Sequence, residues 1–238
     1  MEEVFFSVGK DKLSGNLFMS ENISIDRVAF LIVHGWQSGQ DRDYHLAASL
    51  LNKGYTSMTV DLRGHGKSEG DINQLTRKDY VNDVLSAYDE LVKQAGTMTE
   101  IVAIGSSFGA YLLSLLSEQR KLDGLVLRAP ANYQDARFTE SFMKTRSADD
   151  AEIWKSKFNA WNETRSLKAV HDFKGRVLIV ESEKDEVVPQ SVLQSYADAI
   201  LNRDLLTYVI MQDAPHSITK LPQLQKEYRD TIFKWLGH

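Results

Sequence analysis

The sequence contains no cysteine, and this absence removes several kinds of chemistry at once. Without thiols the chain cannot form a disulfide, attack a substrate through sulfur or bind a metal through sulfur. His45, His171 and His238 show no ligand spacing either, so we expect no metal site and no cofactor. The lack of cysteine also fits a reducing compartment, and we therefore expect a cytoplasmic protein.

Long apolar runs and clustered positive charge are missing as well. No uninterrupted apolar run approaches the roughly 18 residues that a membrane-spanning helix needs. The first residues, 1–7, are partly acidic and lack the apolar core of a signal peptide, so we expect no such leader. The net charge is −5 and no basic stripe stands out, so nucleic acid is not an expected partner.

Runs of apolar residues alternate with segments of helical periodicity along most of the 238 residues. A continuously apolar run of strand length indicates a strand that is buried on both faces. We expect eight strands, at 4–8, 13–19, 28–33, 55–60, 101–104, 124–127, 176–180 and 205–211. Helical spacing predicts helices at 44–52, 77–94, 110–118, 189–201 and 221–235. This alternation predicts an α/β fold, with a mostly parallel sheet covered by helices on both faces.

The alternation lapses between residues 133 and 172, where the pattern is helical and rich in aromatic side chains. We expect residues 133–172 to form a small helical cap inserted into a core made of residues 1–132 and 173–238. Trp154, Phe158 and Trp161 fall at positions i, i+4 and i+7, on one face of a helix. These three side chains either pack the cap onto the core or line a substrate pocket beneath it, and the pattern leaves both roles open.

A serine between two glycines lies at the centre of the chain, in Gly105-Ser-Ser107-Phe-Gly109. An expected strand ends at Gly105 and an expected helix begins within a few residues. Gly-x-Ser-x-Gly at such a place is typical of a nucleophile elbow, a sharp turn that holds a serine hydroxyl out from the end of a sheet. Ser107 is therefore the candidate nucleophile.

A serine hydroxyl needs a base to take its proton, and the base needs a third group to orient it. After an elbow the expected chain order is serine, then an acid, then histidine. Asp185 follows the strand expected at 176–180, and His216 follows the strand expected at 205–211. Because sites in parallel sheets form outside the carboxyl ends of the strands, we expect Ser107, Asp185 and His216 to lie on one edge. Glu183 and Glu186 are close rivals for the acid.

The oxyanion of such a reaction needs two N–H donors that are already in place. The backbone N–H of Phe108, directly after the nucleophile, is one candidate. The other candidate is the backbone N–H of Trp36, in the loop that follows the strand expected at 28–33.

Together these motifs resemble those of the α/β-hydrolase superfamily, and most of all those of small carboxylesterases and monoglyceride-lipase-like proteins. The resemblance spans nearly the whole chain and rests on His34-Gly-Trp36, Asp61-Leu-Arg-Gly-His-Gly-Lys-Ser68, Gly105–Gly109, Lys184-Asp185 with Val188-Pro189, and Pro215-His216. It implies an α/β-hydrolase fold with a mostly parallel eight-stranded sheet. It also implies Ser107 as nucleophile, His216 as base, Asp185 as orienting acid, and Trp36 and Phe108 as oxyanion donors. The chain departs from the family at Ser182, where the acid loop usually carries glycine.

We therefore expect a serine esterase that cleaves small to medium acyl or aromatic esters through an acyl-enzyme on Ser107. A triad alone does not choose the leaving group, so thioesterase, peptidase and acyltransferase activities stay open. A protein of hydrolase fold that binds a ligand without turnover stays open as well. Exposed aromatics on a cap would serve a homodimer as easily as a pocket, so the sequence leaves the oligomeric state open.

Overall fold

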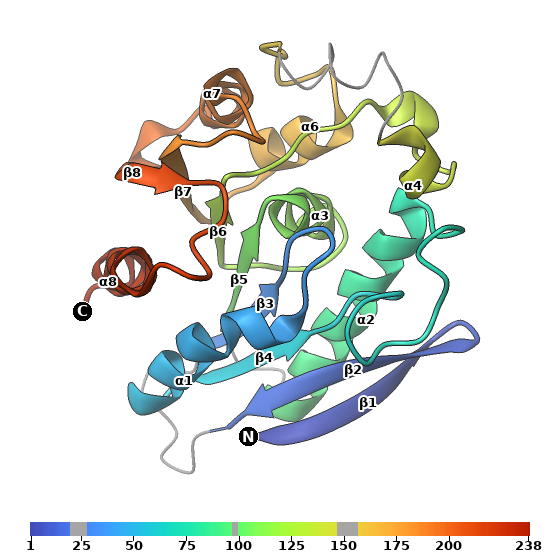
Figure 1. The fold of residues 1–238 in the computed structure, drawn as a ribbon. Coiled ribbons are helices and arrows are strands. Elements are labelled where there is room, and N and C mark those ends of the chain that lie inside the picture. Colours follow the sequence, from blue (N-terminus) through green and yellow to red (C-terminus); the bar gives the residue numbers. More distant parts are fainter. Residues whose placement is uncertain (20–27, 97–99, 147–156) are drawn as a thin grey trace.

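The computed structural model of the chain describes residues 1–19, 28–96, 100–146 and 157–238. One eight-stranded sheet forms the centre, with the strand order β1-β2-β4-β3-β5-β6-β7-β8 (Figure 1). The strands are β1 (Glu2–Val8), β2 (Asp11–Phe18), β3 (Val28–Val33), β4 (Thr56–Val60), β5 (Glu100–Ser106), β6 (Gly124–Arg128), β7 (Arg176–Lys184) and β8 (Leu206–Pro215). Strand β2 pairs antiparallel with β1 and β4, and all other neighbours are parallel. The expected fold class is confirmed.

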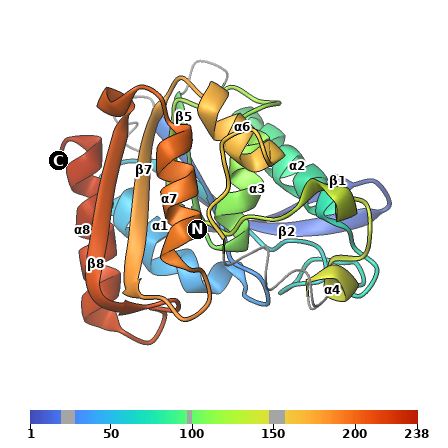
Figure 2. The same ribbon diagram turned by 90° about the horizontal axis from the view of Figure 1, so that it is seen from above.

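Helices cover both faces of this sheet, as Figures 1 and 2 show. One face carries α1 (Tyr44–Asn52) and α8 (Pro222–Leu236). The other face carries α2 (Arg77–Ala95), α3 (Phe108–Leu116), α6 (Arg165–Asp172) and α7 (Gln190–Ala199). Short 3-10 turns, η1 (Gln40–Asp43), η2 (Asp135–Arg137) and η3 (Arg203–Leu205), and a short helix, α4 (Phe142–Thr145), lie in the connections.

Strand β3 shows why both faces need helices. Successive side chains of a strand point to opposite faces, and in β3 both sets are apolar. Leu31 and Val33 belong to the cluster packed under α2 and α3, whereas Phe30 and Ile32 belong to the cluster under α1 and α8. A strand with two apolar faces is stable only when both faces are covered, so the apolar run predicted the layered architecture.

The segment between β6 and β7 holds the residues that we expected to form a cap. Within it α6 lies in the same helical layer as α3 and α7, and its Leu167 and Val170 are buried in the core. Residues 157–164 contain turns and no helix, because the backbone N–H of Asn159 is held by Ser195 Oγ of α7 at 2.8 Å. The helical spacing that we read across Phe158 and Trp161 is therefore not realised there. The division into core and cap stays a prediction.

Among the described residues, no helix combines the length and the apolar character that crossing a bilayer requires.

Candidate active site

Ser107 occupies the sharp turn between β5 and α3. Its backbone has φ 54° and ψ −116°, in a region that residues other than glycine rarely adopt. Hydrogen bonds hold it there: the Ser107 N–H donates to the carbonyl of Arg128 at 2.8 Å, and its own carbonyl accepts from Tyr111 N–H at 3.1 Å and Ala131 N–H at 3.2 Å. The strained turn is therefore fixed by the neighbouring strand and helix.

Both flanking glycines are required by close backbone approach. A Cβ on Gly109 would lie 2.3 Å from the carbonyl oxygen of Val33. A Cβ on Gly105 would lie 2.7 Å from the backbone nitrogen of Ala110. Real side chains do not tolerate such distances to backbone atoms, so the helix can pack this tightly on the sheet only if both positions are glycine.

Asp185 and His216 form a hydrogen-bonded pair at the ends of β7 and β8. His216 Nδ1 lies 2.8 Å from Asp185 Oδ2 and 3.0 Å from Asp185 Oδ1. Burial raises the pKa of the Asp185 carboxyl, but hydrogen bonds from His216 and from the backbone N–H groups of Val188 and Val187 outweigh it, so the pKa lies below its ordinary value. The carboxylate is thus ionised and accepts only, which places the imidazole proton on Nδ1 and leaves Nε2 as an acceptor.

The rival acids bind backbone groups instead of the imidazole. Glu186 accepts from the backbone N–H of His216 at 3.1 Å, and Glu183 accepts from that of Asp213 at 2.7 Å. Among the three acids of this loop, Asp185 is the one that contacts the ring. Asp213 lies near the end of β8, pairs with Lys184 and has a positive φ of 57°, so it affects the path of the chain just before His216.

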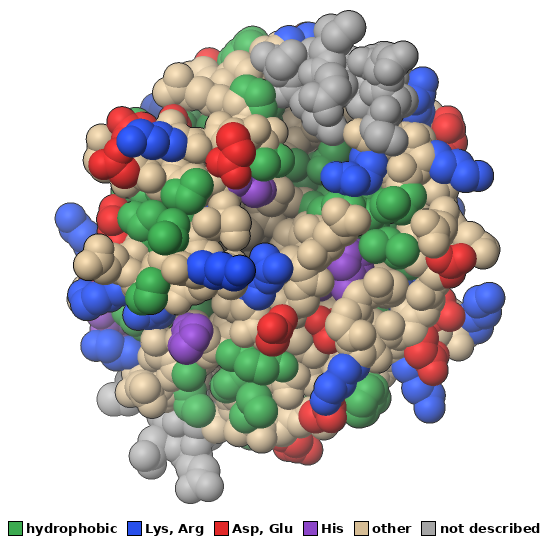
Figure 3. All heavy atoms as spheres, in the orientation of Figure 1, with side chains coloured by type: hydrophobic (Ala, Val, Ile, Leu, Met, Phe, Trp, Pro, Cys, Tyr) green, Lys and Arg blue, Asp and Glu red, His purple; other side chains and the backbone are tan. Residues whose placement is uncertain are grey.

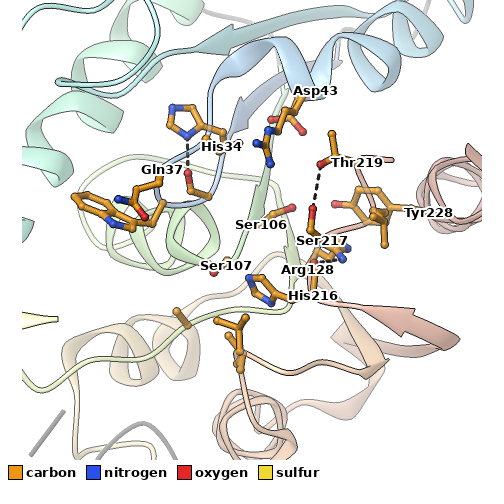
Figure 4. A pocket seen from close by; sticks show the side chains of 18 of the residues that line it. His34, Gln37, Asp43, Ser106, Ser107, Arg128, His216, Ser217, Thr219 and Tyr228 are labelled. Atoms are coloured by element: carbon orange, nitrogen blue, oxygen red, sulfur yellow. Dashed lines mark hydrogen bonds between the residues drawn. The ribbon is translucent and has the colours of Figure 1, made fainter. Parts of the chain in front are cut away.

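Ser107 and His216 meet in a cavity of about 560 Å³ at the carboxyl ends of the strands. Figure 4 shows the two side chains pointing toward one another. In the space-filling view the surface is hollowed near the centre of this face, with Lys or Arg side chains along the rim (Figure 3). The structure therefore brings the three predicted triad residues, which are separated by up to 109 positions, to one place.

The loop after β3 lies directly against the elbow. A Cβ on Gly35 would come within 3.5 Å of Ser107 Cβ, so Trp36 enters the cavity wall beside the nucleophile. Phe108 is the first residue of α3, where helix N–H groups lack partners within the helix. Its ring stacks on Phe142 at 4.6 Å, and Phe142 meets the Trp36 indole edge-on at 4.6 Å. The backbones of Trp36 and Phe108 are thus held by a shared aromatic cluster.

Two buried histidines fix this loop. His34 Nδ1 binds the carbonyl of Gly35 at 2.7 Å, and its Nε2 accepts from Leu62 N–H at 3.1 Å. His65 Nε2 accepts from Gln37 N–H at 3.2 Å. Burial lowers the pKa of His65 and lowers that of His34 to about 4, so both rings are neutral near pH 7. Because both ring nitrogens of His34 are occupied, its role here is structural.

Arg128 is a site residue that sequence reasoning missed. It ends β6, is 5% exposed, and its Nη2 donates to the carbonyls of His216 at 2.6 Å and Pro215 at 3.3 Å. The same nitrogen donates to Ser182 Oγ at 3.1 Å, which explains why a serine can stand where the acid loop of similar proteins carries glycine. An arginine at the end of a buried apolar strand was the signal that could have identified it.

Two of the three predicted substrate-binding aromatics, Phe158 and Trp161, are not brought to this cavity. Phe158 is 48% exposed and Trp161 is 40% exposed, and neither lines the cavity. The Trp161 ring instead stacks on His171 of α6 at 3.9 Å. Trp154 lies outside the described residues. The aromatic wall of the cavity comes from Trp36, Tyr133 and Tyr228.

Comparisons with known proteins agree with this fold. A family model described as serine aminopeptidase, S33, matches residues 25–158, which is more than half of the chain. Among solved structures, Est1E from Butyrivibrio proteoclasticus with ferulic acid bound aligns over 99% of this chain and 100% of its own, with a TM-score of 0.71 and 18% identity. An esterase from Thermogutta terrifontis, solved with malate bound, covers 99% and 98% at a TM-score of 0.69 and 16% identity. The esterase EaEST from Exiguobacterium antarcticum covers 100% of both chains at a TM-score of 0.71 and 14% identity. No curated protein sequence gives a significant match.

Proposed function

Because the chain belongs to the serine aminopeptidase S33 family of the α/β-hydrolase superfamily, we propose that it is a serine hydrolase that cleaves carboxylic esters through an acyl-enzyme on Ser107. The observation that carries the proposal is the meeting of the elbow serine and the Asp185-oriented imidazole of His216 in one open cavity. Two of the structural neighbours are named as esterases, which favours an ester over other acyl substrates.

The reaction follows from the proton positions. His216 Nε2 accepts the proton of Ser107 as the hydroxyl oxygen attacks the carbonyl carbon, and Asp185 stabilises the imidazolium that forms. The negative charge on the carbonyl oxygen is stabilised by the backbone N–H groups of Trp36 and Phe108. His216 then gives its proton to the leaving alcohol. Water repeats the same steps to release the acid and restore Ser107.

The apolar part of the cavity suits a small to medium acyl group. Tyr133, Val188 and Val192 line it beside Ser107, together with Trp36 and Ala131. Pockets of this kind bind apolar groups by burying their surface. A cavity of about 560 Å³ that also holds polar side chains leaves room for a short acyl chain or one aromatic ring beside the alcohol.

Replacing Ser107 by alanine tests the proposal. Wild type should hydrolyse p-nitrophenyl butyrate and should be labelled by a fluorophosphonate probe, because that probe reacts with an activated serine. Ser107→Ala should lose both properties, while Ser106→Ala, one position away and outside the elbow centre, should keep the labelling. Hydrolysis of the ester by Ser107→Ala would contradict the assignment.

Amides are the alternative that the family description favours, because it names a peptidase. Thioesters stay open because a serine triad alone does not choose the leaving group. Acyl-CoA and aminoacyl p-nitroanilides should therefore be assayed beside esters of the same acyl group, and acyl transfer should be measured with added alcohols. A higher kcat/KM for the aminoacyl amide would make the protein a peptidase on the same residues. Labelling of Ser107 without turnover of any of these compounds would indicate a binding protein.

A further inference from the structure

Arg128, the last residue of β6, binds the backbone of the candidate nucleophile and that of the candidate base. Its carbonyl oxygen accepts from the N–H of Ser107 at 2.8 Å. Its guanidinium nitrogen Nη2 donates to the carbonyl oxygen of His216 at 2.6 Å and to that of Pro215 at 3.3 Å. Figure 4 shows Arg128 next to His216. One residue therefore connects the turn that holds the nucleophile to the loop that holds the base.

The order of the strands explains why this connection needs a long side chain. Strand β6 is the direct neighbour of β5, which ends next to Ser107, but β7 separates it from β8, which precedes His216. The backbone at the end of β6 can therefore bind Ser107, whereas a contact with His216 requires a side chain that passes the end of β7. Ser182 of β7 accepts from Nη2 of Arg128 along this path, at 3.1 Å.

The chain around His216 has little support from the sheet. The pairing of β7 with β8 changes register between Ser182 and Lys184, so the ladder is irregular just before His216. Within the described part of the chain, the carbonyl oxygen of His216 accepts from Arg128 and from no backbone N–H. The N–H of His216 donates to Glu186, whose side chain is exposed. Arg128 is therefore the buried contact that fixes the position of this loop.

A buried arginine contributes little to stability at this place. Arg128 is 5% exposed, and the loss of solvent lowers the pKa of its guanidinium. In the described ranges its side-chain hydrogen bonds go to two carbonyl oxygens and one hydroxyl, none of which is charged. The ring of Tyr228, with its centroid 5.9 Å from the guanidinium carbon, offsets part of the cost of burial. Because apolar residues often replace buried charges without loss of stability, the arginine indicates a role beyond folding.

We propose that Arg128 is a positioning residue that sets the distance between the Ser107 hydroxyl and the His216 imidazole, and that Ser182 holds its guanidinium in place. The inference rests on the proposed esterase function. A general base must lie within about 2.6–3.2 Å of the group whose proton it takes. Ser182 is 2% exposed and does not line the cavity, so its hydroxyl reaches the reaction only through Arg128.

Four single variants separate positioning from a general effect on the fold. Arg128→Met removes the donors and keeps a long side chain, whereas Arg128→Lys keeps a cation with three N–H donors. Ser182→Ala removes the hydroxyl that holds the guanidinium. Arg176→Met is the matched control, because Arg176 also donates to a backbone carbonyl, that of Trp235 at 3.1 Å, and also lies beside an aromatic ring. It begins β7, at the end of the sheet away from the cavity.

Hydrolysis of p-nitrophenyl butyrate by the variants measures the effect, with near-ultraviolet circular dichroism as a check of folding. Arg128→Met should lower kcat by about a hundredfold, because a displacement of about 1 Å in an active site has a cost of this order. KM should stay close to that of wild type, because the interaction acts on the base and not on the bound substrate. Arg128→Lys should recover most of the lost kcat. Arg176→Met should keep the kcat and KM of wild type.

A double-mutant cycle tests the role of Ser182. Ser182→Ala alone should lower kcat several-fold without changing KM. In the Arg128→Met background the same substitution should have no further effect, because there is no guanidinium left to hold. The proton between His216 Nδ1 and Asp185 gives a second readout, since protons in such pairs resonate far downfield in the 1H NMR spectrum. This signal should shift or weaken in Arg128→Met and stay unchanged in Arg176→Met.

A folded Arg128→Met protein with the kcat of wild type would overturn the inference, and so would a rise in KM alone, which would make Arg128 a substrate-binding residue. An effect of Ser182→Ala that is the same in both backgrounds would also overturn it. If Arg128→Met does not fold, Ser182→Ala decides: a lower kcat at unchanged KM supports the inference, and an unchanged kcat overturns it. If wild type does not hydrolyse the ester at all, the proposed function itself fails and this inference fails with it.

Discussion

Replacing Asp185 by asparagine should leave His216 unable to act as a base in the proposed active site, while the fold stays intact. Asp185 Oδ1 accepts from the backbone N–H groups of Val187 and Val188, both at 2.8 Å, and an asparagine oxygen can keep both hydrogen bonds. The new amide NH2 then faces His216 Nδ1, where Asp185 Oδ2 now lies at 2.8 Å. Two N–H donors cannot share that position, so the imidazole must move its proton to Nε2.

An imidazole that carries its proton on Nε2 cannot accept the proton of Ser107. Losing the orienting carboxylate of a serine triad in this way lowers kcat by about 10⁴. At about 1.36 kcal/mol for each factor of ten, this is a rise of about 5.4 kcal/mol in the activation free energy. KM should change little, because Asp185 lies behind His216 and is 5% exposed at its side chain.

Hydrolysis of p-nitrophenyl butyrate by Asp185→Asn, with near-ultraviolet circular dichroism as a check of folding, measures this effect. Asp213→Asn is the matched control, because Asp213 is two-thirds or more exposed, pairs with Lys184 and lies in the same loop region without touching the ring. A folded Asp185→Asn protein with kcat within tenfold of wild type would refute the reasoning. The orienting group would then have to be Glu186, which binds the backbone N–H of His216.

Three further predictions concern stability. Arg63→Met should lower the free energy of unfolding, measured by urea denaturation, by about 3–5 kcal/mol, because it leaves the carboxylate of the fully buried Asp83 without the guanidinium whose Nε lies 2.6 Å from its Oδ1. A loss under about 1 kcal/mol would contradict this. Gly109→Ala should yield little soluble protein, because its Cβ would lie 2.3 Å from the Val33 carbonyl; normal expression with wild-type melting would be inconsistent with the packing. The pKa of Asp43 is raised from 3.8 to about 7, so the folded protein keeps a proton that the unfolded chain releases. Its contribution to stability is complete below about pH 4 and is lost as the pH rises to 7, so wild type should lose stability relative to Asp43→Asn over that range, by at most about 1.4 kcal/mol per pH unit. A difference that does not vary between pH 4.5 and 7 would contradict the raised pKa.

Most of the secondary structure could be predicted because local sequence determines it. The helix expected at 44–52 and the strand expected at 28–33 occur with those bounds. The continuous apolar run at 28–33 is stable only where both of its faces are buried, as they are in the centre of a sheet. The helix ends before Gly54, which takes a positive φ of 86°. The meeting of the three candidate triad residues could be predicted for a different reason, since parallel strands bring their carboxyl ends to one edge whatever the loops contain.

The aromatic stretch after residue 156 could not be predicted in the same way. Phe158 and Trp161 have helical spacing, but spacing produces a helix only when the backbone is free to form one. Here Ser195 of α7 takes the N–H of Asn159, and Trp161 finds a partner in His171. Ser195 and His171 belong to helices later in the chain, so the local sequence pattern could not predict these contacts.

Arg128 and Asp43, which both line the cavity, mark the same limit at the candidate site. Arg128 ends an apolar strand, so the local sequence predicts that its side chain is exposed. It is buried instead, because it binds Ser182 and His216. These partners lie 54 and 88 positions further along the chain, so no local pattern predicts them. The sequence predicts that Asp43 caps the helix that follows it, because aspartate is strongly preferred at the N-cap position. Its carboxylate accepts no capping hydrogen bond from the backbone of α1. Asp43 and Arg128 both line the cavity, although they lie 85 positions apart in the sequence. The candidate nucleophile could be found from five residues in a row, whereas the cavity around it is lined by groups that only the folded chain brings together.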